Sequence, residues 1–546
     1  SVRNGRITIK TCIIVSKLEK LNFDNGKGNV LYIEDYVEFS SVAEARKLAD
    51  KIFSNNADFI AEYDYKGYKV TWSWYGDVFQ FCIKYLEIER LMLTINALDV
   101  QHLKIGSISP QYRKVLELYF FNKNITSNAS ESKLLLNIKQ ILFNAVTLLF
   151  SIISIFYFIL RPGRNIGTYT GDFIYKNTKS DFRLNHLYGK YKENNIQYIE
   201  FIRSTKIKNF FINIFKRRRF AIYYTSIIFF VDLFTKKTEY SIQPKDFYQS
   251  VLYNYHHANI MLKKSTLIIE KILKILRIDK FVLISFSSRS AHLAIAAKSL
   301  GIKTIGIMHG LQQKNYAVYE FMQSYHENKK IGCDVYGVWS DYYLEYFKKY
   351  SKISNADSFQ NSGLLRPAEN NSRIVPFVRV KKDRIKVLLI SEPLVSVLEI
   401  IPYLKHMLEN NNIEVAIKVR PMVRDSYYED LKSELPCIKN LNVFSGDIQE
   451  VGKNFDVFVG SYSTAVIEAS LVGKIPVLLN TKKWGDYFDI DTLISNKSLL
   501  VKTPDALNDH IFFRVDNERS LGTIELINDR FFGDNRDGAQ WIVGQL

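Results

Sequence analysis

Cysteine and glycine patterns that mark common types of functional site are absent from the sequence. The four cysteines, Cys12, Cys82, Cys333 and Cys437, are far apart and form no CxxC pair. Neither a disulfide framework nor a zinc site is therefore indicated, and a reducing cytoplasm fits best. No glycine-rich fingerprint of the GxGxxG kind is present, which argues against a nicotinamide or flavin enzyme.

The chain also lacks internal repeats, low-complexity segments and the pattern of a secretory signal. Its N-terminal part mixes charged with apolar residues between Lys10 and Lys20, whereas a signal peptide needs a basic stretch followed by an apolar run, so we do not expect export. With 546 residues, 47% of them hydrophobic, the chain is too long for one core and should form two or more domains.

Acidic residues are outnumbered, and the formal net charge is +18. Such a charge implies an anionic partner, which can be nucleic acid, an anionic membrane surface or a phosphorylated substrate. No recognised nucleic-acid-binding motif accompanies it, so we expect no nucleic acid. The basic run 216–219 lies among phenylalanines and precedes the largely apolar run 221–231. This suits an anionic lipid interface, although a solvated surface loop has the same composition.

One apolar segment is just long enough to span a bilayer. Residues 141–160 contain no charged side chain and are followed by Arg161 and Arg164. A membrane span would put the chain before and after it on opposite sides, and a buried core helix shows the same pattern. We favour a third interpretation, a segment that lies in or against the membrane without crossing it. It predicts a cytoplasmic protein, peripheral at the inner face of the cytoplasmic membrane.

Strands and helices are expected to alternate along most of the chain. After mixed α/β structure in residues 1–130, we expect strands at 165–170, 196–202, 281–286, 304–308, 335–340, 385–390, 415–419, 441–444, 457–459 and 475–479. The helices expected between them include 184–192, 248–276, 291–300 and 395–410. Such alternation predicts parallel sheets. The expected fold class is α/β, with two Rossmann-like doubly wound domains facing each other across a cleft.

A charged connector suggests where these two domains join. We expect the linker near residues 365–384, which gives an acceptor-side domain of residues 1–375 and a nucleotide-binding domain of residues 376–546. The last helix of the second domain can pack back on the first.

Residues 456–476 are the most informative stretch of the sequence. The strand at 457–459 is followed by a small-residue loop that opens a helical pattern. Free N–H groups at a helix start and small hydroxyl donors can bind phosphate. The residues expected to do so are Gly460, Ser461, Ser463 and Thr464. Glu468, expected one helical turn after Thr464, can accept hydrogen bonds from a ribose. The alternative is an ordinary βα unit whose serine only caps the helix.

Further polar residues are expected at other strand ends, where ligands bind in open α/β sheets. His309 and Gly310 end a strand of the first domain, and glycine there lets the backbone approach a ligand closely. A histidine in this position can equally be structural. Arg366 follows Gly363 and precedes a proline, which suggests a tight turn at the hinge with the arginine facing the cleft. The alternative is a plain linker.

Three charged residues end strands of the second domain. Glu392 follows the first strand, and Lys418 and Arg420 end the second, where Pro421 halts it. Because alternate residues of a strand point to the same side, Lys418 and Arg420 can be held toward a diphosphate. Surface ion pairs would explain them equally well.

The order of these motifs resembles that of bacterial GT-B glycosyltransferases of surface polysaccharide (capsule, O-antigen, lipooligosaccharide) synthesis. It looks most like the group that includes polysialyltransferases, Kdo transferases and CDP-glycerol phosphotransferases. The motifs are His-Gly at 309–310, Gly-Leu-Leu-Arg-Pro at 363–367, Lys-Val-Arg-Pro at 418–421, Gly-Ser-Tyr-Ser-Thr at 460–464, Glu-Ala-Ser-Leu-Val-Gly-Lys-Ile-Pro at 468–476 and the closing segment 531–539. The resemblance covers about residues 280–540 and implies a GT-B fold and a metal-independent glycosyltransferase without a cofactor.

One departure from the group concerns the donor nucleotide. Members that use cytidine nucleotides commonly show His-Pro where this chain has Arg420-Pro421. Arginine can neutralise phosphate but cannot exchange a proton at neutral pH. Among CMP-, UDP- and GDP-linked donors, this disfavours the cytidine nucleotide and leaves UDP- and GDP-sugars open.

The resemblance implies transfer of a sugar from a nucleotide-sugar donor to a hydroxyl of a growing surface glycan or glycolipid. Such transfer needs positive groups at the leaving phosphate and a base near the acceptor. We expect Asp172 to be the base, with Asp181 and His309 as competitors. The pair Asp489 and Asp491 has the spacing that metal-dependent transferases use, but it lies beyond the main sheet pattern and we expect a surface loop there.

Three alternatives remain open from sequence. A polyol-phosphate transferase of the CDP-glycerol type would carry a phosphate into the product. A non-catalytic nucleotide-sugar-binding subunit would bind the donor without turnover. An epimerase of the UDP-N-acetylglucosamine 2-epimerase type would convert a nucleotide sugar with no acceptor present.

Overall fold

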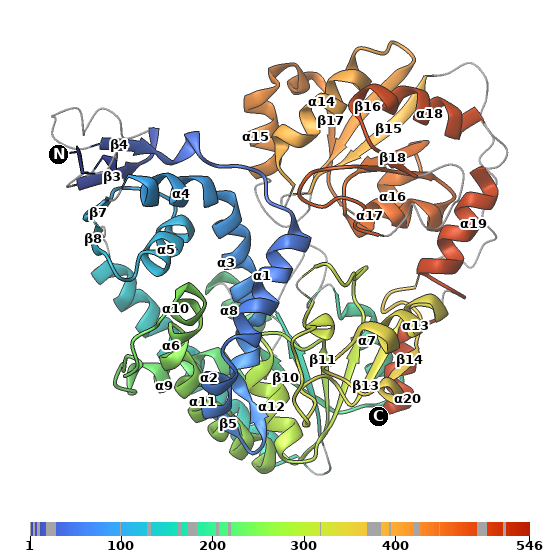
Figure 1. The fold of residues 1–546 in the computed structure, drawn as a ribbon. Helices are drawn as coiled ribbons and strands as arrows, with labels where there is room; N and C mark the ends of the chain where they lie inside the picture. Colours follow the sequence, from blue (N-terminus) through green and yellow to red (C-terminus); the bar gives the residue numbers. More distant parts are fainter. Residues whose placement is uncertain are drawn as a thin grey trace.

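Two six-stranded sheets and a smaller four-stranded sheet organise the chain (Figure 1). The structure, a computed structural model, describes all residues except 1, 4–5, 8–10, 18–28, 99, 128–132, 162, 164, 172–180, 182, 204–206, 217–219, 317, 368–383, 393–394, 420–425, 447, 489–498, 517–519 and 535. The boundary expected at residue 375 lies outside the described residues.

The main sheet of the first domain is parallel and has the order β10-β9-β11-β12-β13-β14. Its strands are β9 (Asn165–Thr170), β10 (Tyr198–Ile202), β11 (Ile278–Ile284), β12 (Lys303–Ile307), β13 (Val335–Val338) and β14 (Phe359–Asn361). The helices between them include α7 (Asn185–Glu193), α10 (Phe247–Tyr253), α11 (His256–Ile275), α12 (Ala291–Ser299) and α13 (Asp341–Tyr350). The next strand in the chain, β10, pairs with one edge of β9, and β11 pairs with the other edge. The strand order therefore reverses between β9 and β11.

The second domain has the order β17-β16-β15-β18-β19-β20, again parallel. Its strands are β15 (Ile385–Ile390), β16 (Ile413–Lys418), β17 (Asn442–Phe444), β18 (Val457–Gly460), β19 (Ile475–Leu479) and β20 (Leu500–Val501). Its helices include α14 (Val397–Leu408), α15 (Ser426–Glu434), α16 (Ile448–Gly452), α17 (Thr464–Ile467), α18 (Leu507–Asp516) and α19 (Ser520–Phe531).

This second sheet has the Rossmann strand order, third-second-first-fourth-fifth-sixth, whose reversal point lies between β15 and β18. Two Rossmann-like domains that face each other constitute the GT-B arrangement, so the expected fold class is confirmed.

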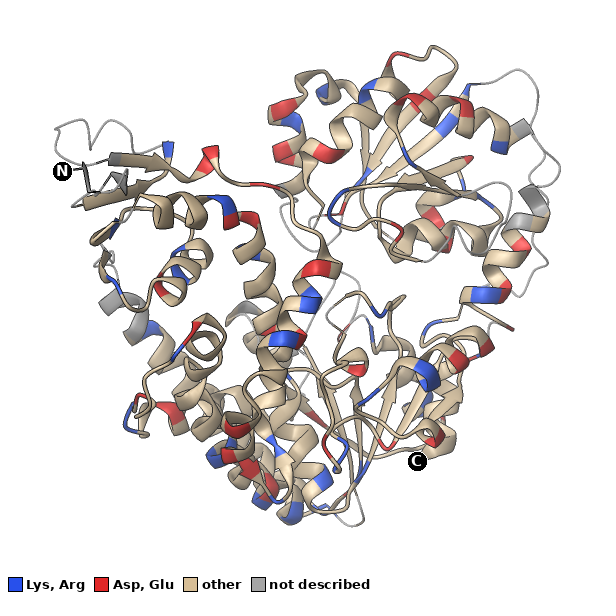
Figure 2. Cartoon of the chain, viewed as in Figure 1, with Lys and Arg blue, Asp and Glu red and all other residues tan. Residues whose placement is uncertain are grey.

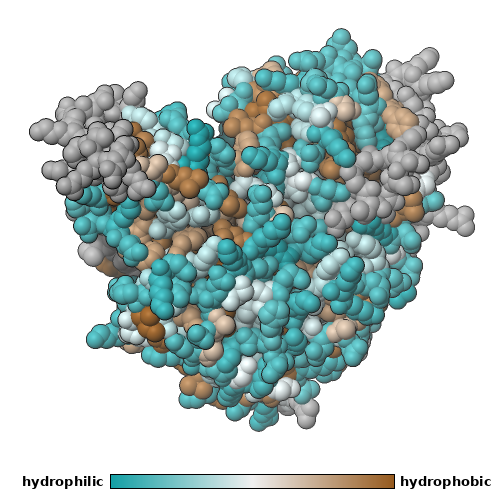
Figure 3. All heavy atoms as spheres, in the orientation of Figure 1, coloured by the Kyte–Doolittle hydropathy of each residue, from teal (hydrophilic) through white to brown (hydrophobic). Residues whose placement is uncertain are grey.

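The chain before the main sheet forms a third layer that the sequence analysis did not predict as a separate sheet. Its parallel order is β4-β3-β7-β8, with β3 (Thr11–Val15), β4 (Asn29–Tyr32), β7 (His102–Ile105) and β8 (Asn124–Ser127). The helices α1 (Val42–Ser54), α2 (Ala57–Glu62), α3 (Tyr75–Glu87), α4 (Glu89–Ala97) and α5 (Pro110–Tyr119) accompany it. Figure 3 shows the surface hollowed between this layer and the second domain.

Most expected elements are present, and two helices differ in an informative way. The helix expected at 248–276 is broken into α10 and α11, and the break lets the Tyr255 ring stack on Trp74 at 5.5 Å between centroids. The helix expected from residue 464 begins as the four-residue α17 and continues as the 3₁₀-helix η8 (Glu468–Val472). Gly473 ends it at φ +69°, a left-handed conformation that favours glycine.

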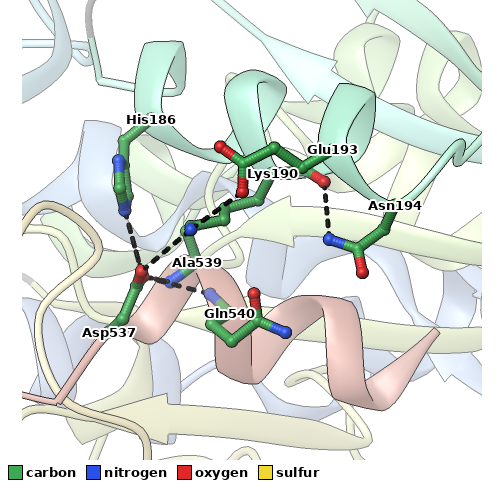
Figure 4. Close-up of polar contacts among 7 residues, drawn as sticks. All are labelled: His186, Lys190, Glu193, Asn194, Asp537, Ala539 and Gln540. Carbon is green, nitrogen blue, oxygen red and sulfur yellow. Dashed lines mark hydrogen bonds and ion pairs between the residues drawn. The ribbon is translucent and has the colours of Figure 1, made fainter.

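The C-terminal helix α20 (Gly538–Gln545) returns to the first domain and packs on α7 (Figure 4). Asp537 caps α20 by accepting hydrogen bonds from the N–H groups of Ala539 and Gln540, at 3.0 and 3.1 Å. The same carboxylate lies 3.0 Å from Nε2 of His186 on α7. Ile542 is fully buried in a cluster with Leu187. One carboxylate therefore both starts the last helix and ties it to the first domain.

We expect Asp537→Ala to destabilise the protein by about 1 kcal/mol or more, since a lost cap alone costs that much and the contact with His186 disappears with it. Urea unfolding measures this. Asp534→Ala is the matched control, because Asp534 lies in the same segment but is mainly exposed. Equal effects of the two variants would contradict the assignment.

Glu320 in the 3₁₀-helix η5 (Tyr319–Phe321) is 2% exposed. Burial raises the pKa of its carboxyl from an ordinary 4.5 to about 7, and a local backbone hydrogen bond opposes the shift. Between these two pH values the unfolded chain has lost the proton that the folded chain still holds. Raising the pH through this interval therefore destabilises the fold, by up to about 1.4 kcal/mol per pH unit.

Replacing Glu320 by Gln should remove this pH dependence. We expect Glu320→Gln to be more stable than the parent at pH 8, with the difference vanishing near pH 4.5, as measured by urea unfolding across the range. Glu345→Gln, at an exposed position of α13, serves as the control. A difference between Glu320→Gln and the parent that does not change with pH would contradict the prediction.

Candidate functional site

Two of the strand-end loops expected to bind ligand meet across the domain boundary. The backbone N–H of Leu311, in the loop after β12, donates to Oγ1 of Thr464 at 3.2 Å. A Cβ placed on Gly310 would lie 3.7 Å from the same hydroxyl oxygen. The carboxyl ends of the two main sheets thus face each other, and Thr464 faces the first domain.

The reversal point of the second sheet is formed by residues singled out from sequence. Glu392 follows β15 and Ser461 follows β18, and both are buried. The Ser461 and Thr481 hydroxyl oxygens are 3.2 Å apart. A Cβ on Gly460 would lie 2.7 Å from Cγ2 of Val466, so glycine is needed for the loop to turn this tightly into α17. In Rossmann-type sheets a nucleotide binds at this crevice.

The helix after this loop differs from the expectation in a way that changes its chemistry. Ser463 is the residue before α17, but its side chain makes no capping hydrogen bond, so the capping alternative does not describe it. Because α17 has only four residues, its macrodipole is smaller than that of the longer helix expected. Glu468 opens the 3₁₀ turn, but its backbone N–H still donates to the carbonyl of Thr464, so the expected spacing of one helical turn between Thr464 and Glu468 is kept.

Lys418 ends β16 beside β15. It is largely buried, and its carbonyl accepts a hydrogen bond of 2.9 Å from the N–H of Ser391. Its position next to Glu392 at adjacent strand ends agrees with the sequence pattern. Arg420 and Asp172 lie outside the described residues, so their expected roles stay predictions.

His309, at the carboxyl end of the first sheet, is exposed to solvent and faces charged groups of the first domain. Desolvation by the surrounding protein, together with the charges of Arg183 and Arg366, lowers the pKa of His309 to about 4, and Asp181 acts in the opposite direction. The imidazole is therefore neutral at pH 7 and can accept a proton.

Asp181 is buried and surrounded by donors. Its carboxylate accepts hydrogen bonds from the Thr170 hydroxyl at 3.1 Å, from the N–H of Gly171 at 3.2 Å and from Arg183, whose Nη2 lies 2.8 Å away. Burial alone would raise its pKa, but Arg183 and these hydrogen bonds lower the pKa of Asp181 below its ordinary value. A carboxylate held in this way is a weak base, so the geometry favours a positioning role for Asp181, which fixes Arg183 and the turn after β9.

A second carboxylate, missed from sequence, faces the same end of the first sheet. Asp77 lies in the first turn of α3. Its side chain reaches solvent, but desolvation by the surrounding protein raises the pKa of Asp77, while a hydrogen bond with Ser288 and the charges of Arg289, Lys114 and Arg203 oppose the shift. In the view of Figure 2 basic and acidic residues are interspersed over both domains, whereas here three cations face one carboxylate. The only sequence signal was an acidic residue at a helix start, in a region without motifs.

Aromatic rings hold the two domains together beside these loops. Tyr316, in the loop after β12, packs on Trp484 of the second domain at 5.2 Å and on Phe79 of α3 at 5.6 Å between centroids. Tyr462 stacks on Trp484 at 3.6 Å. The central tyrosine of the Gly-Ser-Tyr-Ser-Thr motif therefore packs in this aromatic cluster, while its serine and threonine neighbours line the loop.

Arg366 is exposed after the turn at Gly363, whose φ is +76°. A Cβ on Gly363 would lie 2.2 Å from the carbonyl oxygen of Arg536, so glycine is required where the C-terminal segment crosses the hinge.

Among the residues that the structure describes, no group of three or more His, Cys, Asp or Glu side chains could hold a metal ion. Asp489 and Asp491 lie outside them.

The chain is similar in fold to solved structures. No family model and no curated protein sequence matches the chain. Among solved structures, a glycosyltransferase from Rickettsia africae is 12% identical with a TM-score of 0.40, and covers 70% of this chain and 98% of its own. MurG from Acinetobacter baumannii is 13% identical with a TM-score of 0.41, and covers 70% and 99%. UDP-GlcNAc 2-epimerase from Methanocaldococcus jannaschii, in complex with UDP-GlcNAc and UDP, is 14% identical with a TM-score of 0.42, and covers 70% and 98%. Similarity at this level does not extend to substrate or reaction.

We expect Thr464→Val to weaken nucleotide binding roughly fivefold, because one hydroxyl hydrogen bond is worth about 1 kcal/mol and Leu311 loses its acceptor as well. Titration with whichever of UDP, GDP, CMP and CDP gives the largest thermal shift measures this. Thr464→Ser should restore binding, and Thr94→Val is the control, since the Thr94 hydroxyl donates to Arg90 within α4. Unchanged binding by Thr464→Val would remove Thr464 from the site.

Proposed function

We propose that the protein is a glycosyltransferase that moves a sugar from a nucleotide-sugar donor to a hydroxyl of a growing surface glycan or glycolipid. One observation carries the proposal. The reversal point of a Rossmann-ordered sheet lies at Glu392 and Ser461, and three residues after Ser461 the side chain of Thr464 contacts the strand-end loop of a second parallel sheet. A donor bound at the reversal point would have its reactive end at the other domain.

The donor half of the site lies in the second domain. Backbone N–H groups and hydroxyls from Ser461 to Thr464, together with the ammonium of Lys418 and the expected cation Arg420, would hold the diphosphate. A glutamate, Glu392 or Glu468, would accept hydrogen bonds from the ribose. These groups stabilise a nucleoside diphosphate as it leaves, because its negative charge grows as the bond to the sugar breaks.

The acceptor half lies at the carboxyl end of the first sheet. In the proposed step an acceptor hydroxyl forms a bond to the anomeric carbon, the bond from that carbon to the diphosphate oxygen breaks, and the hydroxyl proton passes to a base. His309, neutral at pH 7, and Asp77 are the described groups that can take it, and Asp172 remains the prediction made from sequence. Lys114, Arg203 and Arg289 beside Asp77 favour an acceptor that itself carries negative charge.

A transfer assay tests the function and separates the alternatives. The full chain would be incubated with UDP-, GDP- and CMP-sugars, with and without acidic glycan acceptors, and the products analysed by mass. Sugar transfer without phosphorus in the product supports the proposal. Phosphorus retained in the product would indicate polyol-phosphate transfer, conversion without acceptor an epimerase, and nucleotide binding without any turnover a binding subunit.

Variants of His309 and Asp77 should show which of the two side chains is the catalytic base. We expect the variant of the base, either His309→Asn or Asp77→Asn, to lower kcat by a factor of roughly 10² to 10⁴. The thermal shift caused by the donor should stay unchanged. The parent's kcat/KM should fall as the pH drops through that group's pKa, and the variant should lose this dependence. Asp58→Asn, an exposed carboxylate of α2, is the control. If neither variant slows transfer, the base lies elsewhere and Asp172 becomes the next candidate.

A further inference from the structure

The helix α6 (Lys133–Ile159) carries many of its large apolar side chains on the outside. Residues 138–159 have a mean hydropathy of 2.2, yet only 22% of the most apolar window is buried. Spaced three or four residues apart, the exposed side chains form one stripe about 33 Å long at 1.5 Å per residue. We call this stripe the α6 face, and its members are Ile138, Leu142, Val146, Leu149, Ile153, Phe156 and Leu160.

The inner side of α6 carries small hydroxyl side chains among its apolar contacts, an unusual composition for the protein-facing side of a helix in a soluble domain. Thr147, Ser151 and Ser154 are buried along one line of the helix. The Thr147 hydroxyl lies 2.5 Å from that of Ser226 on α9 (Tyr224–Leu233), and Ser151 accepts a hydrogen bond of 2.9 Å from the N–H of Tyr223. Hydrogen bonds thus fix which side of α6 faces the protein, and apolar side chains are left to face outward.

The chain on both sides of α6 belongs to one packed body, so α6 does not cross a bilayer. Trp74, before α6, donates to Asn259 at 2.8 Å, and the N–H of Gly76 donates to the Tyr319 hydroxyl at 3.1 Å. These partners follow α6 in the chain. A membrane-spanning helix would separate them by the thickness of the bilayer. Among the helices that the structure describes, α6 is the one whose length and composition would allow a span.

Neighbouring segments extend the apolar area. Phe210 of α8 (Ile207–Phe211) contacts Phe143 and Phe150 of α6, at 5.7 and 5.8 Å between centroids. Next to it, Phe211 and Phe215 are exposed and stack on each other at 6.0 Å. Phe234, after the end of α9, is also exposed. Contiguous exposed apolar area of this kind marks a surface that another apolar phase covers.

Basic residues accompany these segments. Lys139 lies on α6, Arg161 follows it, and Lys236 and Lys237 follow α9, and all of them reach solvent. The run 216–219 continues directly from the segment that holds Phe215. Asp232 is the acidic residue on α9, and it lies 2.9 Å from His257. In a symmetric pair of copies these cations would repel one another, whereas an anionic lipid surface attracts them.

We infer that the α6 face, with Phe211, Phe215 and Phe234, lies in the interfacial plane of a bilayer that contains anionic lipid. The helix axis runs parallel to the membrane, the apolar side chains enter the acyl region, and the cations contact lipid phosphates. This inference does not depend on the proposed reaction.

Vesicle sedimentation of the full chain tests it. We expect binding to vesicles of phosphatidylcholine with phosphatidylglycerol, weaker binding to phosphatidylcholine alone, and a decrease with added salt. Leu149→Gln with Phe156→Gln should weaken binding by roughly tenfold per side chain, since each apolar group inserted contributes more than 1 kcal/mol. Leu93→Gln on α4 is the matched control, because Leu93 and Leu149 are both 60% exposed.

Three outcomes would overturn the inference. The first is a parent chain that stays in the supernatant with both vesicle types. The second is equal loss of binding by the α6 variants and Leu93→Gln. The third is a dimer in solution, measured by light scattering, that the α6 variants convert to monomer without any vesicle binding, because a second copy would then cover the α6 face. Circular dichroism of each variant checks that the fold is kept.

Discussion

The carboxyl ends of two parallel sheets point at each other, and most of what the site can do depends on this arrangement. In each sheet the strands end in loops whose N–H groups and small side chains are available to a ligand. The hydrogen bond from Leu311 to Thr464 fixes the distance between the two sets of loops. The ring contacts of Tyr316 with Trp484 and Phe79 hold the same separation from the side. Glycine at 460 permits the tight turn of the loop into α17, where a Cβ would lie 2.7 Å from Cγ2 of Val466.

Much of the fold was predictable because buried parallel strands carry a strong local signal. The strands Asn165–Thr170, Ile385–Ile390 and Ile475–Leu479 have the bounds expected from sequence. The N-terminal sheet was not predicted, since its strands are short and its pairing joins segments far apart in the chain. The break between α10 and α11 could not be predicted from sequence either, because the stacking of Tyr255 on Trp74 is a tertiary contact.

The candidate site was likewise predictable only in part. Local sequence was enough to predict which polar residues follow the strands, and Glu392, Ser461, Thr464 and His309 lie at the expected strand ends. What a side chain does there depends on neighbours from other segments. Asp181 looked like a base from its position, but Arg183 and two backbone N–H groups occupy its oxygens. Asp77 reaches the same region from the N-terminal layer, whose placement no local pattern reveals.

The α6 helix shows why hydropathy alone could not choose among a span, a core helix and an interfacial helix. All three need the same apolar length, and they differ in where the few polar side chains point. In α6 the hydroxyls of Thr147 and Ser151 are buried and make hydrogen bonds to the protein. A core helix would have its opposite side buried as well. That side is exposed. The contacts of Trp74 and Gly76 join the chain before α6 to the chain after it, which supports the inferred position of the helix flat along a surface. A bilayer covering that face would fix the orientation of the whole body, and hence the direction in which the acceptor side of the cleft opens.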